Sequence, residues 1–293
     1  FLFLIVLDPD LAVIKTQNSF LIILFLVNFI YYFNIHMKHT FTDLKNKVVL
    51  LTGGNGFFGK QICNAFLKSG CKVILIDIKK RKLNHKNIFF FNCDITSEKE
   101  IKVIASRISK KFKRIDILIN NAANNYTPGK KKINKEQFNL ENFDKKLWDK
   151  DLHVSLTGAF LCTKIFGKIM SNKNKGNIIN ISSDLGIISP DQRLYSNFVK
   201  PISYSVVKHG IIGLTKYTAT YWANKNIRCN CFAPGGIYNN QPKKFLNKLK
   251  KLIPLNRMAK KNEYNSTILF LASDASSYMN GTTIVSDGGR TIW

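Results

Sequence analysis

The sequence predicts a single-domain α/β fold, a doubly wound parallel sheet with helices on both of its faces. Two observations predict it. From about residue 47 to the C-terminus, short apolar runs typical of buried strands alternate with longer segments of helical periodicity. The first of these strands leads through a glycine-rich turn into a helix, and the second ends in an acidic residue. Sheets of this kind bind ligands at the carboxyl ends of their strands, where we expect the functional site.

The composition is that of a globular domain and excludes several functions. The 293 residues are 45% hydrophobic and 22% charged, enough for a full core. The net charge of +27 comes from scattered lysines without an arginine-rich or aromatic-interleaved module, so we expect no nucleic-acid partner. Lys130–Lys132 and the run Lys243–Lys251 are solvated surfaces or attract an anionic substrate. The six cysteines lack metal-ligand spacing, which indicates buried thiols in a reducing, cytoplasmic compartment.

The first 36 residues differ from the rest of the chain. Phe1–Leu7 and Phe20–Ile35 are strongly apolar, and the second run is slightly shorter than the ~20 residues that a membrane span needs. Met37 begins a stretch typical of the start of a globular domain. Two interpretations stay open for residues 1–36: mistranslated upstream sequence or a cloning artefact, or a membrane tether through residues 20–35. The oxidoreductase domain is expected over residues 37–293.

The first strands predict a dinucleotide-binding unit. Lys47–Thr52 is an apolar strand, Thr52–Gly59 is a glycine-rich turn into a helix, and Lys72–Asp77 is the next strand. The turn fits the G-x-G-x-x-G pattern with Gly54, Gly56 and Gly59. Glycine lets the backbone approach a pyrophosphate, whose charge is favoured at the N-terminus of the helix.

Asp77 predicts which dinucleotide binds. A carboxylate at the end of the second strand accepts hydrogen bonds from both ribose hydroxyls and repels a 2′-phosphate, which favours NAD over NADP. Three basic residues follow closely and weaken this preference: Lys79, Lys80 and Arg81.

The alternation continues to the C-terminus. Ser97 is a predicted N-cap, with Glu100 completing a capping box, for a helix through Lys110. A polar, basic insert runs from Asn124 to about Lys145. The remaining predicted strands are Ile88–Asn92, Ile115–Asn120, Asn177–Ser182, Ile227–Ala233 and Thr282–Val285, and the remaining predicted helices are Leu147–Met170, Tyr204–Asn224 and Asn262–Ala272.

Tyr204 and Lys208 are four residues apart, so they share one face of a helix. A free tyrosine has a pKa of about 10, and a nearby ammonium is expected to lower it toward working pH. Ser183, at the end of the preceding strand, can hold the substrate oxygen that gains or loses a proton. Tyr195 and Lys200 are five residues apart and do not share a face, so they are not expected to form such a pair. The three residues Ser183, Tyr204 and Lys208 outline a carbonyl–alcohol redox site.

With these residues in place, the chain resembles the short-chain dehydrogenase/reductase family, ordinary-length branch, from about Leu44 to the C-terminus. The resemblance rests on TGGNGFFG, the acid after the second strand, CDIT, NNAA, LTGAFLCTK, NIINISS, YSVVK, RCNCFAPGG and SDGG, in this order and spacing. It implies a Rossmann fold, a nicotinamide cofactor, NAD or NADP, and a small-molecule carbonyl or alcohol substrate. The basic insert and the polar segment before Tyr204 resemble those of members associated with bacterial surface-carbohydrate biosynthesis.

The resemblance also implies residue roles. Tyr204 would be the acid/base, Lys208 would lower its pKa and bind the nicotinamide ribose, and Ser183 would bind the substrate oxygen. The implied cofactor-binding residues are Gly53, Asn55, Gly56, Phe58 and Gly59 at the pyrophosphate, Asp77 at the adenosine ribose, Asp94 and Ile95 at the adenine, Asn121 and Ala122 in the cleft, Tyr204 and Lys208, and Pro234, Gly235 and Ile237 on the nicotinamide side. No metal is implied.

The sequence departs from the family pattern at four places. The middle glycine of the first loop is Gly56, as in the longer, sugar-nucleotide branch. Ser155 stands where V-N-x-x-G carries the asparagine of a proton relay, so it either keeps the relay water or slows turnover. About eight extra residues separate Ser183 from Tyr204, and we expect them to overhang the substrate pocket. Asn239 replaces the usual Thr after the Pro-Gly turn.

We therefore expect an NAD(P)-dependent oxidoreductase that interconverts a carbonyl and a secondary alcohol on a sugar, sugar phosphate or nucleotide sugar. The alternatives are a 3-oxoacyl-thioester reductase and a non-catalytic dinucleotide-binding sensor. A homodimer or homotetramer is expected, because relatives pack the equivalents of helices Leu147–Met170 and Tyr204–Asn224 together.

Overall fold

The structure is a computed structural model that describes residues 41–79, 85–126, 136–195 and 199–293. The expectations for residues 1–36, for Lys80 and Arg81, and for Lys130–Lys132 in the basic insert lie outside the described residues. Within the described ranges, no helix combines the length and the apolar character needed to cross a membrane.

Seven parallel strands form one sheet in the order β3-β2-β1-β4-β5-β6-β7. The chain extends the sheet first to one side of β1, through β2 and β3, and then, from β4 onward, to the other. This is the doubly wound arrangement that the sequence predicts. The strands are β1 (Val48–Thr52), β2 (Lys72–Asp77), β3 (Ile88–Asn92), β4 (Ile117–Asn120), β5 (Gly176–Ile181), β6 (Ile227–Pro234) and β7 (Thr283–Ser286).

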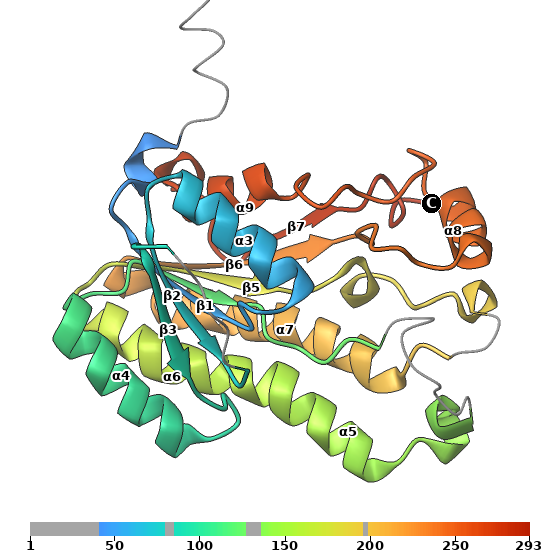
Figure 1. The fold of residues 1–293 in the computed structure, drawn as a ribbon, viewed down its shortest axis with the longest axis horizontal. Helices are drawn as coiled ribbons and strands as arrows, with labels where there is room; N and C mark the ends of the chain where they lie inside the picture. Colours follow the sequence, from blue (N-terminus) through green and yellow to red (C-terminus); the bar gives the residue numbers. More distant parts are fainter. Residues whose placement is uncertain (1–40, 80–84, 127–135, 196–198) are drawn as a thin grey trace, which may run out of the picture. The chain divides into compact units, whose positions relative to one another are not determined.

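Helices cover both faces of the sheet (Figure 1). On one face, α3 (Phe57–Lys68) and α9 (Asn265–Ala272) pack against the strands through apolar side chains that include Phe66 and Ile268. On the other, α4 (Glu98–Phe112), α6 (Gly158–Ser171) and α7 (Ile202–Tyr221) form a second core that includes Phe166. The strands contribute to both cores, because their alternate side chains point to opposite faces. The remaining α-helices are α5 (Lys145–Leu152) and α8 (Lys243–Leu249).

Two local predictions need correction. The predicted helix Leu147–Met170 is divided into α5 and α6 by a π-helical turn at His153–Thr157. The predicted capping box is only half formed at α4. The Ser97 hydroxyl accepts a hydrogen bond from the Glu100 N–H at 3.2 Å, but the Glu100 carboxylate accepts from the Asp94 N–H at 2.9 Å. Glu100 therefore fixes the turn after β3 instead of closing on its own N-cap.

The six cysteines are buried thiols, as predicted. Across the described residues, no cluster of His, Cys, Asp and Glu is arranged to hold a metal ion. The thiols therefore act as apolar core side chains.

Candidate active site

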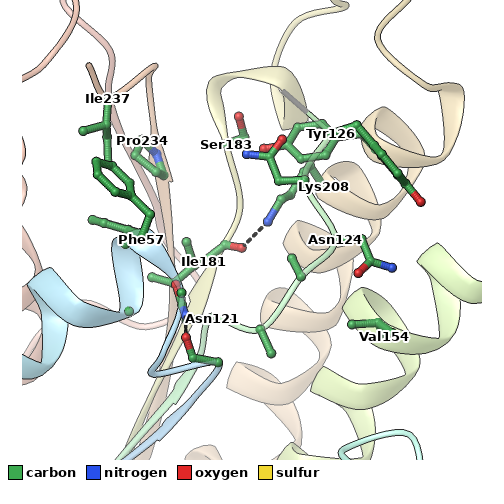
Figure 2. Close-up of a pocket in the computed structure, with 18 of the residues that line it drawn as sticks. Phe57, Asn121, Asn124, Tyr126, Val154, Ile181, Ser183, Lys208, Pro234 and Ile237 are labelled. Atoms are coloured by element: carbon green, nitrogen blue, oxygen red, sulfur yellow. Dashed lines mark hydrogen bonds between the residues drawn. The ribbon is translucent and has the colours of Figure 1, made fainter. Parts of the chain in front are cut away.

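A cavity of about 980 Å³ lies at the carboxyl edge of the sheet, where the strand order reverses between β1 and β4. The loop after β1 and the loop after β4 both line it, together with the ends of β2, β5 and β6 and the start of α7. Open α/β sheets bind their ligands at this switch point. In Figure 2, Pro234 and Ile237 lie to the left of the pocket, Asn124 and Val154 to the right, and Ser183 and Lys208 between them.

The glycine-rich loop after β1 fits an anionic group. Gly53 has φ +65°, and a Cβ there would lie 2.7 Å from the Ala122 Cα. A Cβ on Gly59 would collide with the Gly53 carbonyl oxygen. The N-cap of α3 is Gly56, which has no side chain to occupy the N–H groups of the first helical turn. These N–H groups and the helix dipole form an anion site at which a pyrophosphate fits.

The structure changes the assignment of the glycine pattern. Gly54, taken from sequence as the first glycine of the fingerprint, makes room for Leu75, whose Cδ2 lies 2.5 Å from where a Cβ would be. The left-handed turn belongs to Gly53. Gly54 thus serves packing between the loop and β2, whereas Gly53 sets the loop's path toward the cavity.

The loop after β4 is tied directly to the glycine-rich loop. The Thr52 hydroxyl accepts hydrogen bonds from the backbone N–H groups of Asn121 and Ala122, both at 3.1 Å. The Asn121 amide donates to the carbonyl oxygens of Thr52 at 3.0 Å and Gly53 at 3.1 Å. Asn121 and Ala122, predicted to line the cofactor cleft, therefore also hold its two loops in register.

Asp77 lies at the end of β2 beside this loop. Its two oxygens accept hydrogen bonds from the backbone N–H groups of Asn55 and Lys79, each at 3.0 Å. Because a carboxylate oxygen can accept two hydrogen bonds, both oxygens can also accept from ribose hydroxyls. Asp94 and Ile95 line the same end of the cavity, and Asn55, Gly56 and Phe58 complete it.

Ser183, Tyr204 and Lys208 meet at the other end of the cavity. The Lys208 ammonium is buried and donates to the Ile181 carbonyl oxygen at 2.9 Å, drawn as a dashed line in Figure 2. It lies 5.6 Å from the centroid of the Tyr204 ring. The neighbouring Ser182 hydroxyl donates to the Lys208 carbonyl oxygen at 2.7 Å and anchors α7 to β5. Ser182 is therefore bound to the α7 backbone, whereas the Ser183 hydroxyl lies within hydrogen-bond reach of the Tyr204 phenol.

Burial shifts the pKa values of Tyr204 and Lys208. Loss of solvation raises the pKa of Tyr204 to about 12, against a smaller lowering by a hydrogen bond with Ser183. Loss of solvation also lowers the pKa of Lys208 to about 8. The prediction that Tyr204 has a lowered pKa is therefore wrong for this arrangement. Helical spacing places the ammonium near the phenol, but spacing carries no information on desolvation.

A buried ion pair supports Ser183 and was not predicted. The Ser183 hydroxyl donates to Asp184 Oδ1 at 2.7 Å, and Arg290 Nη1 donates to Asp184 Oδ2 at 2.7 Å. The side chains of Arg290 and Asp184 are only 8% and 5% exposed. Asp184 directly follows Ser183, but its partner lies 106 positions further along the chain. No local pattern could identify that pairing.

Ser155 lies in the π-helical turn beside the loop after β4. Its hydroxyl accepts a hydrogen bond from the Asn124 N–H at 3.2 Å. One turn earlier, buried Asp151 accepts from the Asn124 amide at 2.9 Å, from the Tyr126 hydroxyl at 3.3 Å and from the Ser203 hydroxyl at 2.6 Å. Asp151 thus joins the loop to the start of α7, a role for which the sequence holds no signal. π-Helical turns are frequent at functional sites.

The segment between Ser183 and Tyr204 does line the cavity, as predicted, through Leu194, Tyr195 and Lys200. The opposite wall is formed by Pro234, Gly235, Ile237 and Asn239 after β6. Gly235 is packed so closely that a Cβ would lie 2.7 Å from the Asp287 Cα.

A doubly wound sheet with an anion-binding glycine loop and a Ser-Tyr-Lys group at its switch point defines a nicotinamide-dinucleotide oxidoreductase. The family model described as "Enoyl-(Acyl carrier protein) reductase" matches residues 56–291. The chain belongs to the short-chain dehydrogenase/reductase family, whose members named as dehydrogenases and reductases act on CH–OH groups.

Individual relatives cover nearly the whole domain. The NAD-dependent glycerol dehydrogenase of Listeria innocua is 31% identical, over 85% of this chain and 96% of the relative. The post-translational flagellin modification protein A of Campylobacter coli is 32% identical, over 84% of this chain and 98% of the relative. A short-chain dehydrogenase of Leptospira borgpetersenii, solved with bound NAD⁺, superposes with a TM-score of 0.79 at 32% identity, covering 87% of this chain and 97% of that one.

Proposed function

We propose that this chain interconverts a ketone and a secondary alcohol on a sugar, sugar phosphate or nucleotide sugar, with NAD as its cofactor. The observation that carries the substrate class is the polar lining of the cavity around Ser183 and Tyr204. Amide, ammonium and guanidinium groups converge there, from Asn124, Asn239, Gln241, Lys200 and Arg290. Such groups match the hydroxyls and phosphates of a hydrophilic substrate.

Two of the relatives support this substrate class. One is named for the oxidation of glycerol, a polyol, and another for the modification of flagellin. The second is the observation that supports a place in bacterial surface-carbohydrate biosynthesis.

A 3-oxoacyl-thioester reductase is the second candidate. Phe245, Leu249 and Met258 give one wall of the cavity an apolar surface on which an acyl chain could lie. The description of the matching family model also names an acyl-carrier-protein reductase. The amide, ammonium and guanidinium groups make the other walls of the cavity polar, which favours the first candidate.

In the proposed mechanism, Tyr204 donates a proton to the substrate oxygen during reduction and accepts it during oxidation. Ser183 hydrogen-bonds the same oxygen once its O–H turns from Asp184 Oδ1 to the substrate, while Arg290 holds Asp184 in place. Lys208 keeps two N–H donors beyond its bond to Ile181, which can hold ribose hydroxyls beside Tyr204. The nicotinamide, when bound, supplies or accepts the hydride. Pro234, Gly235 and Ile237 form the wall that excludes water on that side.

The preference for NAD rests on Asp77. Its carboxylate lies where the adenosine ribose is expected, and a 2′-phosphate there would meet a negative charge. The Lys79 backbone N–H donates to Asp77 Oδ1 at 3.0 Å, and the carboxylate keeps acceptor capacity for the ribose hydroxyls.

We also propose a homodimer or homotetramer in the cytoplasm. Large apolar and aromatic side chains lie exposed on α6 and α7: Phe160, Val206, Tyr217 and Tyr221. Surfaces of this kind mark protein–protein contacts. The six buried thiols fit a reducing compartment. Light scattering of the purified protein tests the assembly, and a monomer at micromolar concentration would contradict it.

The test of the proposed function uses the full chain. NADH and NADPH are titrated by fluorescence, and NADH oxidation is then followed with keto-sugars, nucleotide-linked keto-sugars and 3-oxoacyl thioesters. Turnover of a sugar substrate supports the first candidate, and turnover of thioesters alone supports the second. Tight NADH binding without turnover of any compound would favour the non-catalytic sensor and refute the proposal.

A further inference from the structure

Lys200 is held in a fixed place just before α7. Its backbone N–H donates to Gln192 Oε1 at 3.0 Å, and its carbonyl oxygen accepts from Gln192 Nε2 at 3.1 Å. Pro201 follows it, and a residue before proline is disfavoured in helical conformation. α7 accordingly begins at Ile202. Lys200 therefore approaches Tyr204 from outside the helix, which helical spacing cannot predict.

The ammonium of Lys200 lies on the face of the Tyr204 ring. Its Nζ is 3.7 Å from the ring centroid. It donates hydrogen bonds to Asn125 Oδ1 at 2.8 Å and to the Tyr126 carbonyl oxygen at 3.2 Å. The side chain is 7% exposed. An ammonium has three N–H donors, so two are held by the loop after β4 and the ring face occupies the remaining side.

Lys200 is closer to the Tyr204 ring than Lys208 is. The distances from Nζ to the ring centroid are 3.7 Å for Lys200 and 5.6 Å for Lys208. A cation within about 6 Å of the ring centroid is attracted to the ring face, and more strongly when it is shielded from water. A cation at this distance also favours the phenolate over the phenol. Both effects act on Tyr204 from a lysine that the Ser-Tyr-Lys group does not include.

We propose that Lys200 is a positioning residue for Tyr204. Lys200 holds the Tyr204 ring against the cavity wall and makes the phenol a stronger proton donor. The relevance to turnover rests on the proposed function, in which Tyr204 is the acid. The contact itself does not depend on any substrate or cofactor.

The charge of Lys200 is pH-dependent in the neutral range. Burial lowers its pKa to about 7, and the charge of Lys208 acts in the same direction. The carboxylates of Asp184 and Asp151 oppose this lowering, and Asp184 is itself paired with Arg290. Lys200 is therefore charged below about pH 7 and loses its charge above it. Below about pH 7 the charged Lys200 therefore makes the Tyr204 phenol a stronger acid, and reduction of a carbonyl needs such a proton donor.

The test compares two variants in the cofactor-free full chain. Lys200→Arg keeps a positive charge at all accessible pH values, whereas Lys200→Met keeps a chain of similar length without charge. The ionisation of Tyr204 is followed by NMR of ¹³Cζ-labelled tyrosine, its signal being identified by its loss in Tyr204→Phe. An opposite charge at this range shifts a pKa by about 1–3 units. We expect the Tyr204 midpoint to lie that far higher in the Met variant than in the Arg variant.

Two further results decide the interpretation. In the unmodified protein, the Tyr204 signal should also shift in a step near pH 7 that both variants lack. Equal Tyr204 midpoints in the two variants would overturn the proposal and leave Lys200 a structural residue. If Lys200→Met does not fold, Gln192→Leu releases the Lys200 backbone instead, and an unchanged step near pH 7 in the Tyr204 signal there would also overturn it. Because no substrate is used, these outcomes are separate from any failure of the proposed function.

Discussion

The buried pair of Arg290 and Asp184 allows a quantitative test of the account of Ser183. Arg290→Met removes the guanidinium from an ion pair whose atoms are 2.7 Å apart and whose side chains are 8% and 5% exposed. Asp184 keeps its Oδ1 bonds from the Ser183 hydroxyl and the Leu185 N–H, but its charge then lies buried without its ionic partner.

Removing one partner of a buried pair costs about 3–5 kcal/mol, because the other charge is left uncompensated. Arg290 lines the cavity, so water can reach the vacated space and the lower end, about 3 kcal/mol, is expected. This is a large share of a typical unfolding free energy of about 5–15 kcal/mol. The double variant Asp184→Leu with Arg290→Met is expected to lose much less, since it buries no charge.

The assay is urea unfolding of the full chain, followed by circular dichroism. Arg257→Met is the matched control, because Arg257 pairs with Glu263 at the same 2.7 Å but both side chains are solvent-exposed, 48% and 33%. It should lower stability far less than Arg290→Met. Equal losses for the two arginine variants, or a double variant as unstable as Arg290→Met, would refute the argument that burial makes this pair important.

Three further predictions test other parts of the site. Unmodified protein should bind NADH at least about tenfold more tightly than NADPH in fluorescence titrations, a difference of about 1.4 kcal/mol. Asp77→Asn should remove most of this preference. Equal loss of affinity for both cofactors would contradict the role of Asp77. Gly59→Ala should abolish NADH binding because its Cβ collides with the Gly53 carbonyl oxygen, whereas Gly213→Ala, whose Cβ meets no described atom within 4 Å, should bind normally. Between pH 7 and about 10 the unfolded chain holds a proton on Lys200 that the folded chain lacks. The free energy of unfolding, relative to that of Lys200→Met, should therefore rise with pH by up to about 1.4 kcal/mol per pH unit. If urea unfolding gives the same difference between the two proteins at every pH, Lys200 titrates normally.

The fold could be predicted because its signals are local. Each strand is a short apolar run, and β2 and β3 have the predicted ends, Lys72–Asp77 and Ile88–Asn92. The π-helical turn at His153–Thr157 was missed because its apolar spacing continues that of the helices on either side. It depends on one additional residue per turn, which periodicity over a long window does not resolve.

The site was predicted where it follows strand ends and helical spacing, and was missed where it depends on the tertiary fold. Ser183, Tyr204 and Lys208 do come together in the cavity. Helical spacing does not identify Lys200, because this residue lies before the start of α7. Arg290 and Asp151 act through partners far away in the chain, and the raised pKa of Tyr204 results from burial. None of these properties is visible in a stretch of sequence.

The central claim is that Tyr204 supports hydride transfer between a nicotinamide and a hydroxyl-bearing carbon. The most direct measurement incubates the full chain with a keto-sugar and NADH carrying deuterium at the transferred position, and records the mass of the alcohol product. The account predicts one deuterium in the product, and a rate at least about a hundredfold lower for Tyr204→Phe, in line with loss of general acid catalysis, in a variant that still binds NADH. Full activity in Tyr204→Phe, or an alcohol without deuterium, would contradict it.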